Sequence, residues 1–202
     1  DYSGRLSTDD NYEQAYPGEA AWYNITLKNT GTRVIDSFEI EVEDEMEFEN
    51  IEISPSLMTI SSLATKKISI NISVPSIDDK IIETGVYDLV FMAISEGETS
   101  SDEDDIIVHN ITLKIKVMPV YKLQYLIPEG STSIEPGYTT GNFELNVTNK
   151  GNEPVTVLLK KDSQTQASYQ KWATISPATL SDLQPNTATS SNVKFKVPSG
   201  SM

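Results

Sequence analysis

Hydrophobic residues occupy every second position through much of this chain. In residues 22–27 (WYNITL) apolar and polar side chains alternate, and residues 67–74 and 108–117 repeat that alternation. Because side chains of a strand point alternately to its two faces, each segment predicts a strand with one dry and one wet face. Short strands of this kind, separated by Pro, Gly, Asn and Ser, predict an all-β fold of Ig-like antiparallel sandwiches.

Six strands are expected in the first half of the chain. They cover residues 19–29, 34–43, 46–53, 66–74, 85–95 and 106–118. Tyr87, in the fifth of them, occupies the place where Ig-like sandwiches often carry a corner tyrosine, whose hydroxyl bonds to backbone. An ordinary strand aromatic is the alternative interpretation.

The second half of the chain repeats landmarks of the first. The segment 17–31 (PGEAAWYNITLKNTG) recurs as 136–151 (PGYTTGNFELNVTNKG), and 53–76 (ISP…VPS) recurs as 175–199. Four landmarks in one order indicate a duplication. The sequence therefore predicts two tandem sandwiches, residues 1–118 and 119–202.

The two copies differ after their final landmark. Copy one continues for some 40 residues beyond Ser76 and supplies two strands there, whereas copy two reaches Met202 soon after Ser199. We therefore expect the second sandwich to lack its last strands. Three explanations are open: the chain is cut from a longer one, which we favour; another subunit donates the strands; or the second sheet is smaller. The polar residues 1–14 are no obvious donor strand.

These landmarks resemble a known group of modules. The pattern PGE, then NITLKNTGT, ISP, VPS and GVYDL is similar to Ig-like modules of prokaryotic surface proteins, namely CARDB-type adhesion repeats and the NPCBM-associated modules of secreted glycosidases. The resemblance covers nearly all of copy one and two-thirds of copy two. It implies tandem extracellular spacers, of archaeal or bacterial origin, that link or present other domains, and it transfers no catalytic residue.

Charge narrows the classes of partner. The chain has 15 basic and 30 acidic residues, a net charge of −15, and this argues against binding nucleic acid or an anionic membrane surface. No apolar run approaches the roughly 20 residues that span a bilayer, so no membrane insertion is expected. The excess of acidic residues is confined to copy one, which has 8 basic and 24 acidic residues. Copy two has 7 basic and 6 acidic residues.

Acidic residues form two clusters in copy one. Between Asp36 and Glu52 there are nine acids and no base, with Glu at alternate positions, and a turn is expected at Asp44-Glu45. The second cluster is 95–105 (SEGETSSDEDD). Either could be a solvated surface that keeps the protein soluble, or a Ca²⁺ site, since Ca²⁺ takes six to eight oxygen ligands. The ligands in the second cluster would be Asp102, Asp104 and Asp105.

Little in the chain predicts catalysis. There is no cysteine and one histidine, His109, in phase with the inward residues of its strand, which favours a core or rim histidine over a catalytic base. No P-loop, GxGxxG or HExxH motif occurs. We expect no enzyme, no catalytic residue and no cofactor other than Ca²⁺.

Two features of the sequence could involve carbohydrate, one by covalent attachment and one by binding. Four N-glycosylation sequons lie on expected strands with their middle residue inward and their Asn outward; the acceptors are Asn24, Asn71, Asn110 and Asn146. Trp22 and Trp172 could stack on a sugar, although packing is the commoner role of a strand aromatic.

The sequence therefore predicts a non-catalytic, extracellular structural or adhesion module of a larger, S-layer-like cell-surface protein. Its partners would be neighbouring domains or surface-protein subunits. A carbohydrate-binding or spacer module of a secreted glycosidase is the first alternative. A subunit that assembles by β-strand donation is the second.

Overall fold

The computed structural model describes residues 3–43, 47–48, 50–95, 106–126, 137, 143–164 and 170–199, with Asp36 and residues 106–108 described by their backbone alone. This part of the chain forms fifteen β-strands. It separates into two compact units, unit 1 (Asp1–Pro119) and unit 2 (Val120–Met202). Each is described by itself. Nothing among the described residues forms a helix long and apolar enough to cross a bilayer.

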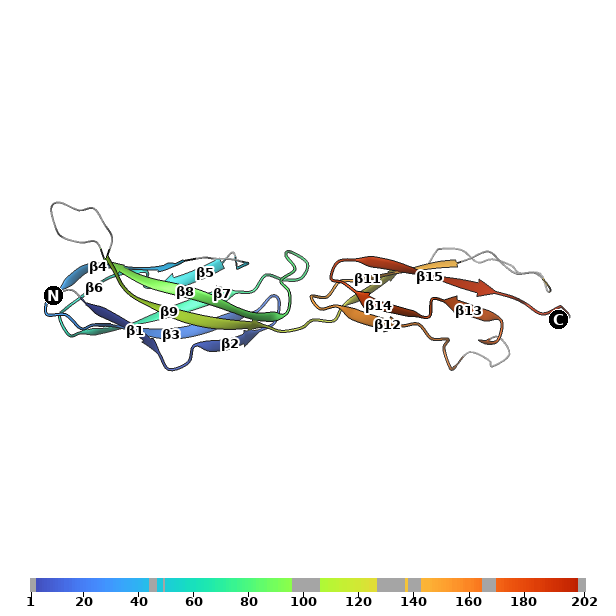
Figure 1. Cartoon of the computed structure of the whole chain (residues 1–202), viewed down its shortest axis with the longest axis horizontal. Coiled ribbons are helices and arrows are strands. Elements are labelled where there is room, and N and C mark those ends of the chain that lie inside the picture. The colour runs from blue at the N-terminus through green and yellow to red at the C-terminus, as the bar shows by residue number, and fades with distance from the viewer. Residues whose placement is uncertain are drawn as a thin grey trace. The chain divides into compact units, whose positions relative to one another are not determined.

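Unit 1 is a sandwich of two sheets (Figure 1). The first sheet is antiparallel and has the order β1 (Gly4–Thr8), β3 (Ala20–Asn29), β7 (Thr65–Ser73), β5 (Asn50–Ser54). The second has the order β2 (Tyr12–Ala15), β9 (Ile106–Val117), β8 (Gly85–Ser95), β4 (Ile35–Val42), β6 (Leu57–Ile60). The expected antiparallel pairing is wrong at one place, because β2 runs parallel to β9.

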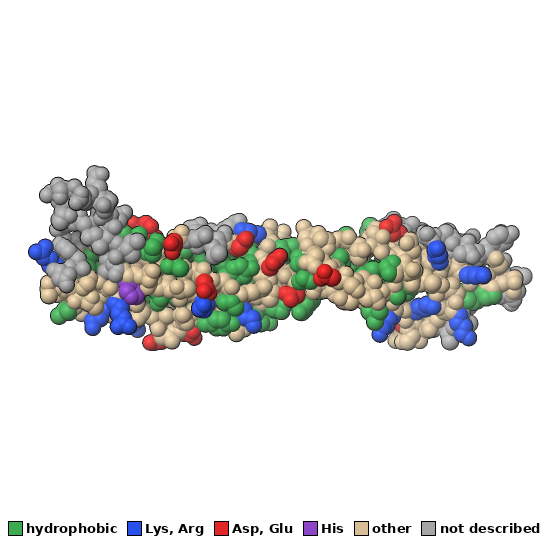
Figure 2. Space-filling model, in the orientation of Figure 1, with side chains coloured by type: hydrophobic (Ala, Val, Ile, Leu, Met, Phe, Trp, Pro, Cys, Tyr) green, Lys and Arg blue, Asp and Glu red, His purple; other side chains and the backbone are tan. Residues whose placement is uncertain are grey.

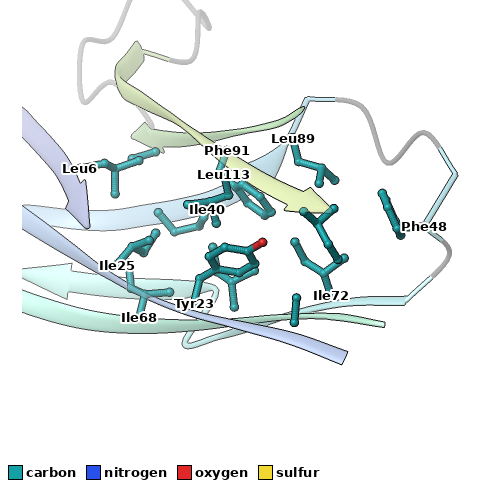
Figure 3. Close-up of a cluster of buried hydrophobic side chains, with 14 of the residues drawn as sticks. Leu6, Tyr23, Ile25, Ile40, Phe48, Ile68, Ile72, Leu89, Phe91 and Leu113 are labelled. Carbon is teal, nitrogen blue, oxygen red and sulfur yellow. The ribbon is translucent and has the colours of Figure 1, made fainter. Parts of the chain in front are cut away.

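The core of unit 1 lies between these sheets and comes from the alternate residues of their strands. In Figure 3, Tyr23, Ile25 and Ile68 of the first sheet face Phe91 and Leu113 of the second. All five are at most 2% exposed. Removing such side chains from water is the main favourable term in folding, about 1.5–3 kcal/mol for each. The period-two pattern of the sequence is thus the pattern of this core.

The expected strands of copy one correspond to β3, β4, β5, β7, β8 and β9. Three short strands were not expected: β1, β2 and β6. From the sequence, residues 1–14 were considered only as a strand for donation to another subunit, and no strand of this unit was expected there. In the structure Leu6, and Ala15 directly after this segment, are both nearly fully buried in the core of unit 1. The turn expected at Asp44-Glu45 lies outside the described residues.

Unit 2 contains a smaller set of strands. One antiparallel sheet has the order β10 (Leu123–Leu126), β11 (Phe143–Asn149), β15 (Ala188–Phe195), β13 (Ala173–Ser176). β12 (Val155–Leu158) pairs with β14 (Thr179–Leu183) in a two-stranded sheet. Within the described residues no counterpart of β8 or β9 is present. The buried core is correspondingly small and centres on Val147, Leu180 and Leu183.

Two of the repeated sequence landmarks meet in space, and they do so in both units. Gly18 and Gly137, the glycines of the two Pro-Gly turns, have φ angles of 88° and 90°, which a residue with a β-carbon rarely adopts. The N–H of Gly18 donates to the carbonyl of Val74 at 2.9 Å, and that of Gly137 to Val197 at 2.8 Å. The Pro-Gly and VPS motifs are therefore the two sides of one contact.

A buried asparagine closes the other end of β3 and β11. Asn29 and Asn149 are both 0% exposed. The Nδ2 of Asn29 donates to the carbonyls of Arg33 and Ile60, and its Oδ1 accepts the N–H of Gly31 at 2.9 Å. Asn149 repeats this set with the carbonyls of Glu153 and Leu183 and the N–H of Gly151. The Asn-x-Gly motif is thus a buried junction between three backbone segments.

We expect Asn29→Ala to lower the free energy of unfolding of unit 1 by about 3 kcal/mol, because it leaves buried carbonyls and an N–H without partners. Asn149→Ala should act likewise on unit 2. Denaturant unfolding followed by tryptophan fluorescence measures each effect, with Trp22 reporting on unit 1 in a Trp172→Phe background and Trp172 on unit 2 in a Trp22→Phe background. The matched control is Asn24→Ala on the exposed face, with an expected loss of about 0.5 kcal/mol. Equal losses for Asn29 and Asn24 would contradict the junction.

Candidate functional site

His109 on β9 takes part in a contact between the sheets. Its side chain is half-buried, and its Nδ1 accepts the backbone N–H of Leu6 on β1 at 3.2 Å. Leu6 belongs to the opposite sheet, so the imidazole joins the two layers at the edge of the core. This bears out the expected rim histidine, since one ring nitrogen is engaged in a structural bond.

Two tyrosines also use their hydroxyls to hold backbone. Tyr23 donates to the carbonyl of Lys114 on β9 at 2.7 Å and so links the sheets. Tyr87 donates to the carbonyl of Glu83 at 2.8 Å, and its ring packs edge-on against Phe48, with 5.5 Å between centroids. The backbone hydrogen bond expected of a corner tyrosine is confirmed at Tyr87, but its ring is half-buried and not buried as such a tyrosine's would be. Burial raises the pKa of both phenols, with the charge of Glu13 adding to the shift at Tyr23.

The outer face of the first sheet carries an exposed aromatic among polar groups. Trp22 is 61% exposed, so its expected role in packing is wrong; the inward positions of β3 are the odd-numbered ones. Its cross-strand neighbour is Asn71, whose Nδ2 donates to Glu52 at 3.4 Å. A flat aromatic surface beside amide and carboxylate groups is chemistry that can bind a sugar ring.

Trp172 lies in unit 2 and does not repeat this arrangement. Its side chain is half-buried, directly before β13, and its carbonyl accepts the N–H of Lys196 at 2.8 Å. The half-burial of the side chain agrees with the packing interpretation. Trp22 is the exposed tryptophan of the described residues.

The four sequons fall into two classes of exposure. Their middle residues all face inward, as expected. Asn24 and Asn110 are exposed, whereas Asn71 and Asn146 are half-buried, so the expected outward direction holds fully for the first two. The Oδ1 of Asn71 is buried and has no hydrogen-bond partner. Asn24 and Asn110 are therefore the more accessible acceptors.

The acidic row on β4 is a surface feature. Glu39 and Glu41 are exposed and alternate with the inward residues of the strand, and the exposed Glu43 follows directly after it. Their neighbours across the sheet are the apolar Ile94 and Met92, so the carboxylates do not converge on one point. In Figure 2 most of the acidic side chains in view lie over unit 1, whereas basic side chains are seen over both units.

No cluster of three or more His, Cys, Asp or Glu side chains suited to a metal ion exists among the described residues. Asp102, Asp104 and Asp105, the expected Ca²⁺ ligands, lie outside those residues, and the Ca²⁺ site stays a prediction. Glu47, part of the first acidic cluster, pairs with Lys80 at 3.3 Å.

A hollow of about 430 Å³ opens on unit 2. It lies between the residues that follow β12 and the strand β13, and its walls are largely apolar, with Leu159 and Ile175 beside the stems of Lys160 and Lys161. Sequence patterns gave no sign of it.

No protein-family model matches this chain, and no curated protein matches it. Among solved structures it is similar to a PapD-like domain of human CEP192 (14% identity, 56% of this chain and 84% of that chain, TM-score 0.39). The E. coli chaperone DraB is similar at 11% identity (98% and 88% covered, TM-score 0.39). So is the CARDB domain of the PF1109 protein from Pyrococcus furiosus, a complex with di-metal ions, at 15% identity (58% and 88% covered, TM-score 0.35).

All three TM-scores are below 0.5, and these likenesses assign neither a family nor a function to the chain. The all-β sandwich fold rests on the sheets themselves. Membership of the CARDB-type or NPCBM-associated modules stays a prediction.

Exposure of the four acceptors leads to a first test. If the source organism glycosylates this protein, we expect glycans at Asn24 and Asn110 and none at Asn71 or Asn146. Glycopeptide mass spectrometry of protein from its source gives the occupancy of each. Occupancy at Asn71 above that at Asn24 would contradict the role assigned to exposure.

The buried phenol of Tyr23 leads to a second test. Its pKa is raised in the folded state, so the unfolded chain releases this proton first as the pH rises past the ordinary value of 10.0. The folded state then binds more protons than the unfolded one, and the free energy of unfolding falls with increasing pH above 10. Urea titrations of unit 1 at pH 9 to 11 should show this fall. Tyr23→Phe should make it shallower; an unchanged slope would contradict the assignment.

Proposed function

We propose that this chain is a non-catalytic β-sandwich module of a larger cell-surface protein, which spaces or presents the domains beside it. The observation that carries the proposal is the repetition of the same structural junctions in both units. The Asn-x-Gly junction and the Pro-Gly to VPS contact recur with partners at corresponding positions. A tandem repeat that conserves its scaffold contacts is a way of building length from one kind of part.

The polar chemistry of unit 1 supports this proposal. Three titratable side chains are used within the fold: His109 accepts the Leu6 N–H, and Tyr23 and Tyr87 each hold a carbonyl. The exposed glutamates of β4 have the apolar Ile94 and Met92 as their neighbours across the sheet. These glutamates serve solubility on an extracellular surface.

Location on intact cells tests the proposal. An antibody against this chain should label whole cells of the source organism, and externally added protease should remove the label. The matched control is an antibody against a cytoplasmic protein of the same cells, whose signal should appear only after lysis. Labelling of the chain only after lysis would overturn the proposal.

A second candidate function rests on Trp22. Its exposed indole on a flat polar face supports a carbohydrate-binding module, the role expected of an accessory domain of a secreted glycosidase. Affinity electrophoresis through gels that contain cellulose, chitin or xylan derivatives measures this binding. Trp22→Ala should abolish any retardation, and Tyr121→Ala, an equally exposed aromatic of unit 2, should leave it unchanged. Retardation that survives Trp22→Ala would remove this candidate.

A further inference from the structure

The inner sheet face of unit 2 is open where that of unit 1 is covered. Tyr125 of β10 pairs with Val147 in the way that Leu6 of β1 pairs with Leu27, so Tyr125 and Leu6 hold equivalent places. Leu6 is 2% exposed and Tyr125 is 67% exposed.

The same contrast holds along the neighbouring strands. Phe143 occupies the place of Tyr23, and Val193 and Phe195 those of Ile70 and Ile72. The three residues of unit 1 are at most 2% exposed, whereas all three of unit 2 are only half-buried. An apolar sheet face left in this state is normally covered by another layer.

Unit 1 shows what covers such a face. β8 and β9 form the middle of its second sheet, and six of their inward side chains are 0% exposed; these are Leu89, Phe91, Ala93, Leu113, Ile115 and Val117. These two antiparallel strands pack on the very positions that are open in unit 2. The cover is therefore a β-hairpin with an apolar residue at every second position.

The edge to which such a hairpin would bind is also present in unit 2. In unit 1, β4 pairs with β6 along one edge and with β8 along the other. Its counterpart β12 pairs with β14, and no described strand occupies its second edge. The apolar hollow bounded by Leu159 and Ile175 begins directly after β12, between the residues that follow this strand and β13. Open backbone groups and an open apolar face thus occur together, which is the arrangement that strand addition uses.

We propose that unit 2 is completed by a β-hairpin that pairs with the open edge of β12 and covers the inner face of β10, β11, β15 and β13. The hairpin follows unit 2 in the same polypeptide. The order of elements in unit 1 supports this source, since β8 begins nine residues after the VPS motif that ends at Ser76. A tethered hairpin also binds at a high effective concentration. This inference is independent of where the protein resides or what it presents.

The hairpin of unit 1 provides a direct test. We would append residues 77–118 after Ser199, in place of residues 200–202, so that the second VPS motif is followed as the first one is. The appended residues contain no tryptophan. Trp22→Phe then leaves Trp172 as the sole fluorescent tryptophan and the reporter of unit 2.

The appended hairpin should raise the thermal midpoint reported by Trp172 by at least about 10 °C. Hydrogen exchange of the amides of Val155–Leu158 should slow by at least about tenfold. The matched control carries Leu89→Asp, Phe91→Asp and Leu113→Asp in the appended copy only, and it should show neither effect.

Three outcomes would overturn the proposal. The first is an unchanged Trp172 midpoint with the apolar hairpin, and the second is an equal rise with its Asp-substituted control. The third is a dimer of the 202-residue chain whose Trp172 midpoint rises with concentration, because the face would then be taken by a second copy. Sequencing of peptides from the protein's source checks the origin of the hairpin. An alternating apolar segment that begins about nine residues after Ser199 is the expected result, and its absence would overturn the cis assignment.

Discussion

A buried carboxamide joins three backbone segments at the same end of each unit. The side-chain amide of Asn29 donates to main-chain carbonyls and its oxygen accepts a main-chain N–H, and Asn149 makes the same kinds of bond. Because these partners lie on the following turn and on a strand of the opposite sheet, the side chain sets how the two layers meet. An alanine there could keep the strands but not their relation to each other.

The units share this junction and differ in what lies above it. In unit 1 the junction closes a sandwich whose middle strands contribute six fully buried apolar side chains. In unit 2 three buried apolar residues form the core. At about 1.5–3 kcal/mol for each buried aliphatic or aromatic side chain, this difference exceeds any contribution from the repeated hydrogen bonds. The polar junctions therefore specify the architecture of both units, while the larger buried hydrophobic core makes unit 1 the more stable of the two.

The sequence predicted those strands whose alternation was long enough to stand out. β3, β7, β8 and β9 each alternate over many residues, and each places one face in the core. β1 and β2 escaped notice because each inserts one residue deeply, Leu6 and Ala15, into a core built by strands far away in the sequence. Local patterns do not contain that information.

The contacts of the candidate site residues show the same difference between local and long-range information. Tyr87 was predictable, because its acceptor, Glu83, is four residues away. The bonds of Asn29 to Ile60, 31 residues distant, and of His109 to Leu6, 103 residues distant, depend on the completed fold. The Asn-x-Gly motif indicated a repeat in the sequence, but it did not indicate that the side-chain amide of the asparagine is buried. Trp22 was misjudged although its own strand gave its direction, since the odd positions of β3 were already known to be apolar.

The parallel pairing of β2 with β9 has a mechanical consequence. β2 lies near the start of unit 1 and β9 is its last strand, and the two run side by side in the same direction from Tyr12 and Lys114 to Ala15 and Val117. Tension that pulls the two ends of the unit apart draws these strands past each other along their length. The hydrogen bonds of the pair, with those of Lys114 to Asn11 and Met118 to Ala15 beside them, then bear the force together instead of opening one at a time. The short strand β2, which adds little to the core, is in this way the element that resists unfolding when the unit is stretched.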